Sequence, residues 1–214
     1  MNRINVMVAD DNPIVRAGLY RFINDAVDIK VIGEASCAEQ AYRLFNELNP
    51  NVLLIGCLYT RGMSGLEALR RILIRHPSAK VIVYTLHDDL AFAGFSLSCG
   101  ARGYITGLSD THELIKAIRT VVKGKIYISS NMAKKIAVQS MSQDENPLKC
   151  LSAKEFEMFR LLAEGCSVKE ISEILSVGSK TVANYQTNIK HKLAINSPVD
   201  IVRMAIRYEV IAMH

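Results

Sequence analysis

The sequence lacks any apolar run approaching the roughly 20 residues that a helix needs to cross a bilayer. Its first apolar stretch, Ile4–Ala9, is short and leads directly into Asp10, so we expect no secretory signal. The five cysteines are odd in number and show no CxxC or zinc-ligand spacing. We therefore expect a cytoplasmic protein with reduced thiols and no structural metal.

Acidic residues are missing from one part of the chain. None occurs between Glu173 and Asp200, where Lys180, Lys190 and Lys192 all fall. The whole chain carries a net charge of +5. A local excess of lysine favours a polyanionic partner such as a nucleic acid.

The first 122 residues alternate short β-branched runs with longer segments of helical periodicity. Continuous apolar strands separated by helices are typical of a parallel sheet covered on both faces. We therefore predict an α/β domain with a five-stranded, doubly wound parallel sheet. The expected strands are 4–9, 30–35, 52–57, 80–85 and 103–106, and the expected amphipathic helices are 13–25, 38–48, 65–76, 89–98 and 110–122.

The remaining chain is different. Residues 123–148 are rich in polar side chains and predict a linker with one short helix near 131–139. Residues 149–214 are purely helical in pattern and predict a four-helix domain. Ser152 with Glu155, and Ser167 with Glu170, have the spacing of capping boxes, and Gly178 and Pro198 indicate the starts of the last two helices. The predicted domains are thus 1–122 and 149–214.

The carboxyl ends of the first, third and fourth strands bring Asp10, Asp11, Gly56 and Thr85 to one edge of the predicted sheet. Adjacent carboxylates suit a hard divalent cation such as Mg²⁺. The residues alone leave a second interpretation open: Asp10 and Asp11 could simply cap the helix that begins near Pro13.

Residues 4–122 resemble the receiver domain of two-component response regulators. The resemblance rests on VADDNPIVRAGL at 8–19, GEASCAEQA at 33–41, GMSGLEALRRI at 62–72, VIVYTLHDD at 81–89 and GARGYI at 100–105. It implies an acidic pair at Asp10 and Asp11 and a conformational switch made of Thr85 and Tyr104. In that family, an aspartate on the third strand accepts a phosphoryl group, and a lysine on the fifth strand neutralises its charge.

The sequence departs from the receiver pattern at the reacting groups. The phospho-acceptor position is Gly56 and the lysine position is Gly107. No Asp or Glu lies between Glu47 and Glu67, so a shifted alignment cannot supply an acceptor. We expect no phosphoryl transfer, no catalytic residue and no enzymatic activity. We also expect Mg²⁺ binding to be weak or absent, with Asp10, Asp11 and Thr85 left as a vestigial acidic pocket.

Residues 151–195 predict a helix-turn-helix and resemble the LuxR-type domain of regulators of the NarL/FixJ class. The matching residues include Leu151-Ser152, Lys169-Glu170-Ile171, Thr181-Val182 and Lys192-Leu193. The complete arrangement is similar to the GacA/UvrY branch of that class. The resemblance implies that the third helix of this domain enters the major groove of double-stranded DNA.

We assign the candidate DNA contacts from the expected outer face of that helix. Asn184 suits adenine, and Thr187 suits a base edge or a thymine methyl group. Ala183 stands where relatives often carry lysine. The remaining polar side chains suit phosphates, although each of them could equally be an ordinary exposed helix residue. The full candidate set is Ser179, Lys180, Thr181, Ala183, Asn184, Thr187, Asn188, Lys190 and Lys192.

The last helix, 198–208, is expected to expose Ile201, Val202, Met204 and Ala205. In the family this helix pairs two DNA-binding domains, so these residues predict a homodimer, although they could instead complete the core of their own domain. The function that follows is a DNA-binding transcription regulator that works without phosphorylation. The alternative is an interaction module that forms heterodimers with another response regulator and modulates it.

Overall fold

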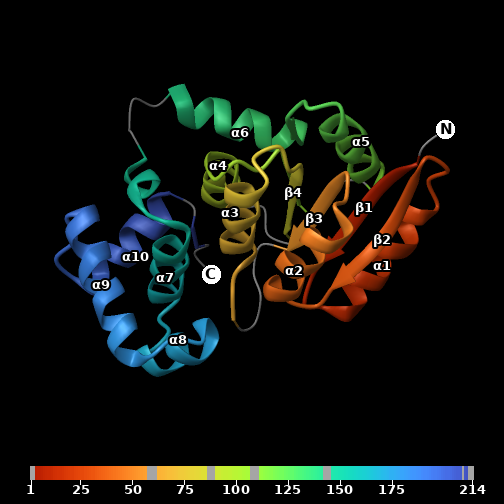
Figure 1. Cartoon of the computed structure of the whole chain (residues 1–214). Coiled ribbons are helices and arrows are strands. Elements are labelled where there is room, and N and C mark those ends of the chain that lie inside the picture. Colours follow the sequence, from red (N-terminus) through yellow and green to blue (C-terminus); the bar gives the residue numbers. More distant parts are fainter. Residues whose placement is uncertain are drawn as a thin grey trace. The chain divides into compact units, whose positions relative to one another are not determined.

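The computed structural model describes residues 3–56, 62–85, 90–106, 111–141, 146–208 and 210–211. Two compact units make up the chain (Figure 1). The first contains residues 1–88 and 96–133, and the second contains residues 89–95 and 134–214. Within the described ranges, no helix is both long enough and apolar enough to span a bilayer.

The first unit is built on a parallel sheet of six strands in the order β2-β1-β3-β4-β5-β6. The parallel doubly wound architecture is therefore confirmed, but the expected number of five strands was wrong. The sixth strand is a two-residue edge strand, too short to leave a periodic pattern, which pairs with β5 through Gly103 and Tyr104. The strands are β1 (Ile4–Ala9), β2 (Ile29–Ala35), β3 (Val52–Gly56), β4 (Val81–Thr85), β5 (Gly103–Thr106) and β6 (Tyr127–Ile128).

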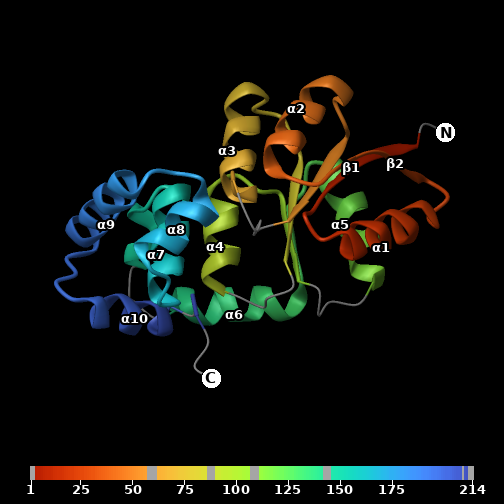
Figure 2. The same ribbon diagram turned by 90° about the horizontal axis from the view of Figure 1, so that it is seen from below.

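Helices cover both faces of this sheet (Figure 2). Helices α1 (Pro13–Asn24) and α5 (Thr111–Val122) lie on one face, and α2 (Ala38–Leu48) and α3 (Gly65–Arg75) lie on the other. The core of the first face joins Ile23 of α1 and Ile118 of α5 to Val8 and Leu54 of the sheet, all at most 1% exposed. Apolar side chains on both faces explain why the central strands read as continuous apolar runs.

Helix α4 (Leu90–Ser98) was expected to be amphipathic, and that expectation was wrong. It carries no charged side chain, and residues on several of its sides are buried, which is typical of a helix enclosed by protein. Its leading part belongs to the second unit. There the ring of Phe95 stacks on Phe156 with centroids 4.4 Å apart, and Phe92 meets the same ring edge-on at 5.1 Å.

The second unit is helical, and its capping boxes form as predicted. The Ser152 hydroxyl accepts from the Glu155 amide while the Glu155 carboxylate accepts from the Ser152 amide, and Ser167 and Glu170 repeat the arrangement. Its helices are α6 (Ser130–Met141, which begins in the first unit), the 3-10 helix η1 (Pro147–Cys150), α7 (Ala153–Ala163), α8 (Val168–Leu175), α9 (Ser179–Leu193) and α10 (Pro198–Arg207).

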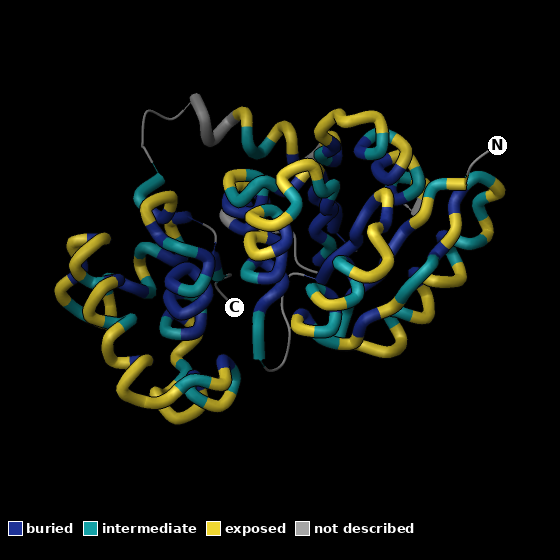
Figure 3. The backbone as a smooth tube through the Cα atoms, in the orientation of Figure 1, coloured by how far each residue is buried: buried dark blue, intermediate teal, exposed yellow. Residues whose placement is uncertain are grey.

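The turn between α8 and α9 contains Gly178 at the position that the sequence predicted, directly before α9. The left-handed residue that ends α8 is Ser176, with φ of 50°, whereas Gly178 has an ordinary φ of −70° and begins α9 as its N-cap. Val182 and Ile189 then face the domain core with no exposed surface. The opposite side of α9 is exposed over its length (Figure 3). The fold thus fixes which side of α9 is free to meet a partner.

Candidate functional site

The vestigial acidic pocket lies where the carboxyl ends of β1 and β3 adjoin. Asp10 follows β1, and its Oδ1 accepts from the Asn12 amide at 2.9 Å. The guanidinium of Arg16 donates to the Asp10 backbone oxygen at 2.8 Å. Burial raises the pKa of the Asp10 carboxyl, and neighbouring Asp11 acts in the same direction, against the Asn12 amide and Arg16. Asp10 is therefore a partly buried carboxylate held by its own loop.

Gly56 ends β3 directly beside that carboxylate. A Cβ atom built on Gly56 would lie 2.9 Å from Oδ2 of Asp10, closer than real Cβ atoms come to other groups. A side chain at position 56 would therefore require the Asp10 carboxylate to shift. Within β3 itself, Val52–Gly56, no side chain is a nucleophile that could accept a phosphoryl group.

The donor set here does not fit a magnesium ion. Mg²⁺ requires near-octahedral oxygen coordination, and Gly56, which lies beside Asp10 at this edge of the sheet, adds no carboxylate to those of Asp10 and Asp11. Among the described residues, no group of three His, Cys, Asp or Glu side chains gathers closely enough to hold a metal. Oδ1 of Asp10 already accepts from the main chain.

The alternative interpretation, that the acidic pair caps the first helix, is wrong. The N-cap of α1 is Asn12, whose side chain accepts from the amides of Ile14 and Val15. Asp10 instead holds the amide of that cap residue. Thr85 and Tyr104 are both buried, Tyr104 completely. Gly107 and the segment 57–61 lie outside the described residues.

The second candidate site is the outer face of α9. Val182, Ile189 and Leu193 turn into the core, so the opposite face is defined by residues about half a turn away. That face carries Lys180, Asn184 and Thr187, which are all exposed. Ser179, Thr181, Ala183 and Asn188 are exposed beside them, and Lys190 is half-buried. The structure therefore brings most of the candidate DNA contacts to one side of one helix.

His191 was missed by the sequence prediction. It is exposed and lies on the same face as Asn184 and Thr187, at seven and four residues from them. The helical spacing from Lys180 through Asn184 and Thr187 to His191 was a signal available in the sequence. The last turn of α9 also carries Lys190 and Lys192, and its first turn has no acidic residue.

Lys192 is placed differently from the prediction that it contacts phosphate. Its ammonium donates to Oε2 of Glu155 at 2.7 Å and to the backbone oxygen of Cys150 at 3.4 Å. The Glu155 side chain is only 7% exposed. Burial raises the pKa of Glu155, but Lys192 and the Ser152 amide and hydroxyl outweigh burial and hold this pKa below its usual value. Lys192 thus ties the end of α9 to the start of α7.

The predicted dimerisation face on α10 is wrong for two of its four residues. Ile201 is 4% exposed and Ala205 has no exposed surface, so both complete the core of their own domain, where α10 packs against α7. Val202 and Met204 are half-buried. Val199, which the sequence analysis did not select, is 57% exposed.

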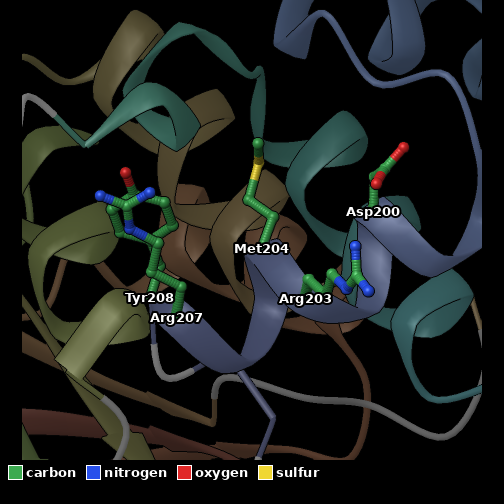
Figure 4. Close-up of a pocket in the computed structure, with 5 residues that line it drawn as sticks. All are labelled: Asp200, Arg203, Met204, Arg207 and Tyr208. Carbon is green, nitrogen blue, oxygen red and sulfur yellow. The ribbon is translucent and has the colours of Figure 1, made fainter.

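Met204 contributes to a shallow pocket on α10 of about 210 Å³, shown in Figure 4. The guanidinium of Arg207 lies over the ring of Tyr208, 5.6 Å from its centroid, and Arg203 lies beside Asp200 on the other side of Met204. Asp200 also closes a capping box with Ser197, which was not predicted. Its carboxylate is thereby committed to the helix start.

Two family models match the chain. Residues 6–119 match the response regulator receiver domain, and residues 149–205 match the luxR family of bacterial regulatory proteins. The chain is 35% identical over 207 residues to the response regulator GacA of Pseudomonas aeruginosa, covering 96% of each chain. It is equally 35% identical to the response regulator UvrY of Escherichia coli, covering 96% of this chain and 94% of UvrY.

Solved structures agree over nearly the whole chain. RcsB of Salmonella enterica serovar Typhimurium, bound to promoter rprA in the presence of a phosphomimetic, matches with a TM-score of 0.69 and 26% identity. That match covers 95% of this chain and 98% of RcsB. A second RcsB structure, of two dimers bound to two parallel DNAs, matches with a TM-score of 0.61 and 25% identity, with the same coverage.

Proposed function

The chain belongs to the response regulators that join a receiver domain to a LuxR-type DNA-binding domain, and we propose that it regulates transcription without phosphorylation of its receiver. The observation that carries the proposal is the pair Gly56 and Asp10. The acceptor position has no side chain, and the neighbouring carboxylate already crowds the place where one would begin. Such a regulator acts where chromosomal DNA lies, in the cytoplasm.

The DNA contacts we propose follow the exposed face of α9. Ala183, Asn184 and Thr187 would meet base edges, because they lie near the middle of the helix and opposite its buried side. His191 joins this set on the same grounds. Lys192 leaves it, since its ammonium is paired with Glu155. Ser179, Lys180, Thr181, Asn188 and Lys190 remain as contacts to phosphates.

The assembly we propose is a homodimer that forms without a phosphodonor. RcsB is similar to this chain and its structure on DNA contains dimers. Two recognition helices on one DNA gain affinity from their linkage. The buried positions of Ile201 and Ala205 move the candidate interface on α10 to Val199, Val202 and Ile206, which share the side away from the core. With glycine at the acceptor position, the proposed switch of Thr85 and Tyr104 has no phosphoryl group to respond to, so the receiver should rest in one state unless another ligand favours the other state.

The test uses the full chain and random duplex DNA. Sequences retained by the protein are selected, and affinity is then measured over a salt series with and without acetyl phosphate and Mg²⁺. We expect a sequence preference that is independent of the phosphodonor, and no +80 Da species by intact mass. A response regulator with an intact acceptor aspartate, treated in parallel, shows that the phosphodonor is active.

Two outcomes would contradict the proposal in different ways. A +80 Da adduct that hydroxylamine removes would establish a phosphorylated receiver. A lack of any sequence preference at every salt concentration would remove the DNA-binding role. If the protein also co-purified with a second response regulator, the heterodimerising module would be the better description.

A further inference from the structure

The side chain of Thr187 is held by its own helix. Its hydroxyl donates to the backbone oxygen of Ala183, one turn earlier, at 3.0 Å. Both residues are exposed. A threonine hydroxyl has one hydrogen, and this bond uses it. Thr187 can therefore offer a partner its methyl group and the lone pairs of its oxygen, but no hydrogen-bond donor.

This limits which bases the side chain can recognise. In the major groove guanine presents only acceptors, at N7 and O6. Thr187 has no free hydrogen to donate to either of them. Adenine and cytosine present amino donors, and thymine presents a C5-methyl group. Thr187 in this state discriminates against guanine on the strand that it faces.

The neighbouring residue Ala183 narrows the set of bases that this part of α9 can recognise. Ala183 lies on the same side of α9, four residues before Thr187, and its only side-chain atom is a methyl carbon. The two methyl groups form a small uncharged surface in the middle of a helix whose ends carry Lys180 and Lys190. Such a surface gains most from an apolar group on the DNA.

We propose that Thr187, together with Ala183, is a specificity-determining residue that reads the methyl group of one thymine in the major groove. The inference rests on the proposed function, because it requires that α9 enter the groove. Asn184, next to this surface, retains its amide and reads a neighbouring base independently. The recognition therefore combines one apolar contact with one hydrogen-bonding contact.

The experiment removes single chemical groups from the DNA and from the protein. DNA selected by the wild-type protein is resynthesised with uracil in place of each thymine in turn, which removes only the C5-methyl group. We expect one position at which wild-type binding falls about fourfold, the value of one buried methyl group. T187V keeps the methyl and loses the hydroxyl, so it should retain that sensitivity. T187S keeps the hydroxyl and loses the methyl, so uracil should bind it as well as thymine does.

The controls separate this inference from the function on which it rests. T181V alters a threonine that we assign to a phosphate, so it should weaken binding to thymine and uracil DNA alike and leave the ratio between them unchanged. N184A should relax preference at a different base pair. If the wild-type protein selects a sequence but T187S keeps the uracil effect and T187V loses it, the hydroxyl is the reader and the inference is wrong. Uracil insensitivity at every thymine also overturns it. If no sequence is selected and N184A binds like wild type, the DNA-binding proposal itself has failed.

Discussion

The ammonium of Lys192 lies 2.7 Å from a carboxylate oxygen of Glu155, and this ion pair joins the last turn of α9 to the first turn of α7. The same carboxylate accepts from the Ser152 amide at 2.7 Å. One nearly buried side chain therefore caps α7 and anchors the recognition helix. The contact therefore helps to hold the end of α9, whose exposed side we propose to bind DNA, against α7, alongside the buried side chains of Val182, Ile189 and Leu193.

We predict that K192M destabilises the C-terminal domain by about 1–3 kcal/mol, because it leaves the nearly buried Glu155 without its counter-charge, and that E155Q costs less, about 1 kcal/mol, because Lys192 is 40% exposed. Glutamine still closes the capping box, so E155Q tests the ion pair and not the cap. Denaturation of both single variants and of the double variant gives the coupling energy. If the double variant loses the sum of the two single losses, the side chains are independent and the ion pair contributes nothing.

The same pair predicts a pH dependence. The pKa of Glu155 is lowered in the folded protein, so its contribution is present above the unfolded pKa, about 4.3. It is lost as pH falls through the lower folded pKa. We expect the stability difference between wild type and E155Q to be constant from pH 8 to pH 6 and to shrink below about pH 4. A difference that grows as the pH falls would contradict this sign.

The sequence predicted the parts of this fold that rest on local chemistry. The capping boxes at Ser152 and Ser167 formed because they need only residues three positions apart. The parallel sheet followed from apolar runs alternating with helices. Strand β6 could not be predicted, because two residues carry no period and their pairing with β5 depends on the rest of the sheet.

The candidate sites were harder to predict because exposure depends on tertiary packing. On α10, Ile201 and Val202 are adjacent apolar residues, and only the packing against α7 decides that the first of them is buried. On α9, Lys192 looks like any cation near DNA until the fold brings Glu155, 37 residues away, beside it. The lack of a nucleophile at Gly56 could be predicted without a structure, because glycine has no side chain.

An aspartate introduced at position 56 should allow Mg²⁺ to bind and should lower the stability of the metal-free protein. We predict that G56D is destabilised by about 1–2 kcal/mol without metal, because a second carboxylate enters beside the partly buried Asp10. Mg²⁺ at about ten times its dissociation constant should then raise the Tm of G56D by roughly 5 °C and leave the wild type unchanged.

The matched control is G56A, which adds the Cβ atom without the charge. It should show the steric part of the destabilisation and no response to Mg²⁺. Thermal melts of the three proteins with and without the metal decide the matter. A Mg²⁺-dependent Tm in the wild type would show that Asp10 and Asp11 suffice for a metal site, against the donor set described above.

The core side of α10 and its proposed interface should respond differently to substitution. I201A should lower the free energy of unfolding by about 2–4 kcal/mol, because Ile201 is 4% exposed and its truncation leaves a cavity against α7. V199D alters a side chain that is 57% exposed and places a carboxylate in the first turn of the helix, where the dipole favours it. The fold should therefore tolerate V199D, while the burial of this charge between two copies of α10 should not be tolerated.

Sedimentation at micromolar concentration measures the consequence. We expect the wild type to be dimeric with or without acetyl phosphate and Mg²⁺, and V199D, with an unchanged Tm, to be shifted toward monomer with weaker binding to two-site DNA. V199A, which adds no charge, is the matched control and should remain dimeric. A wild-type protein that is monomeric under every condition would end the dimer proposal. A dimer that survives V199D, and survives V202D as well, would place the interface away from this side of α10, since an aspartate cannot be buried there in both copies without a partner.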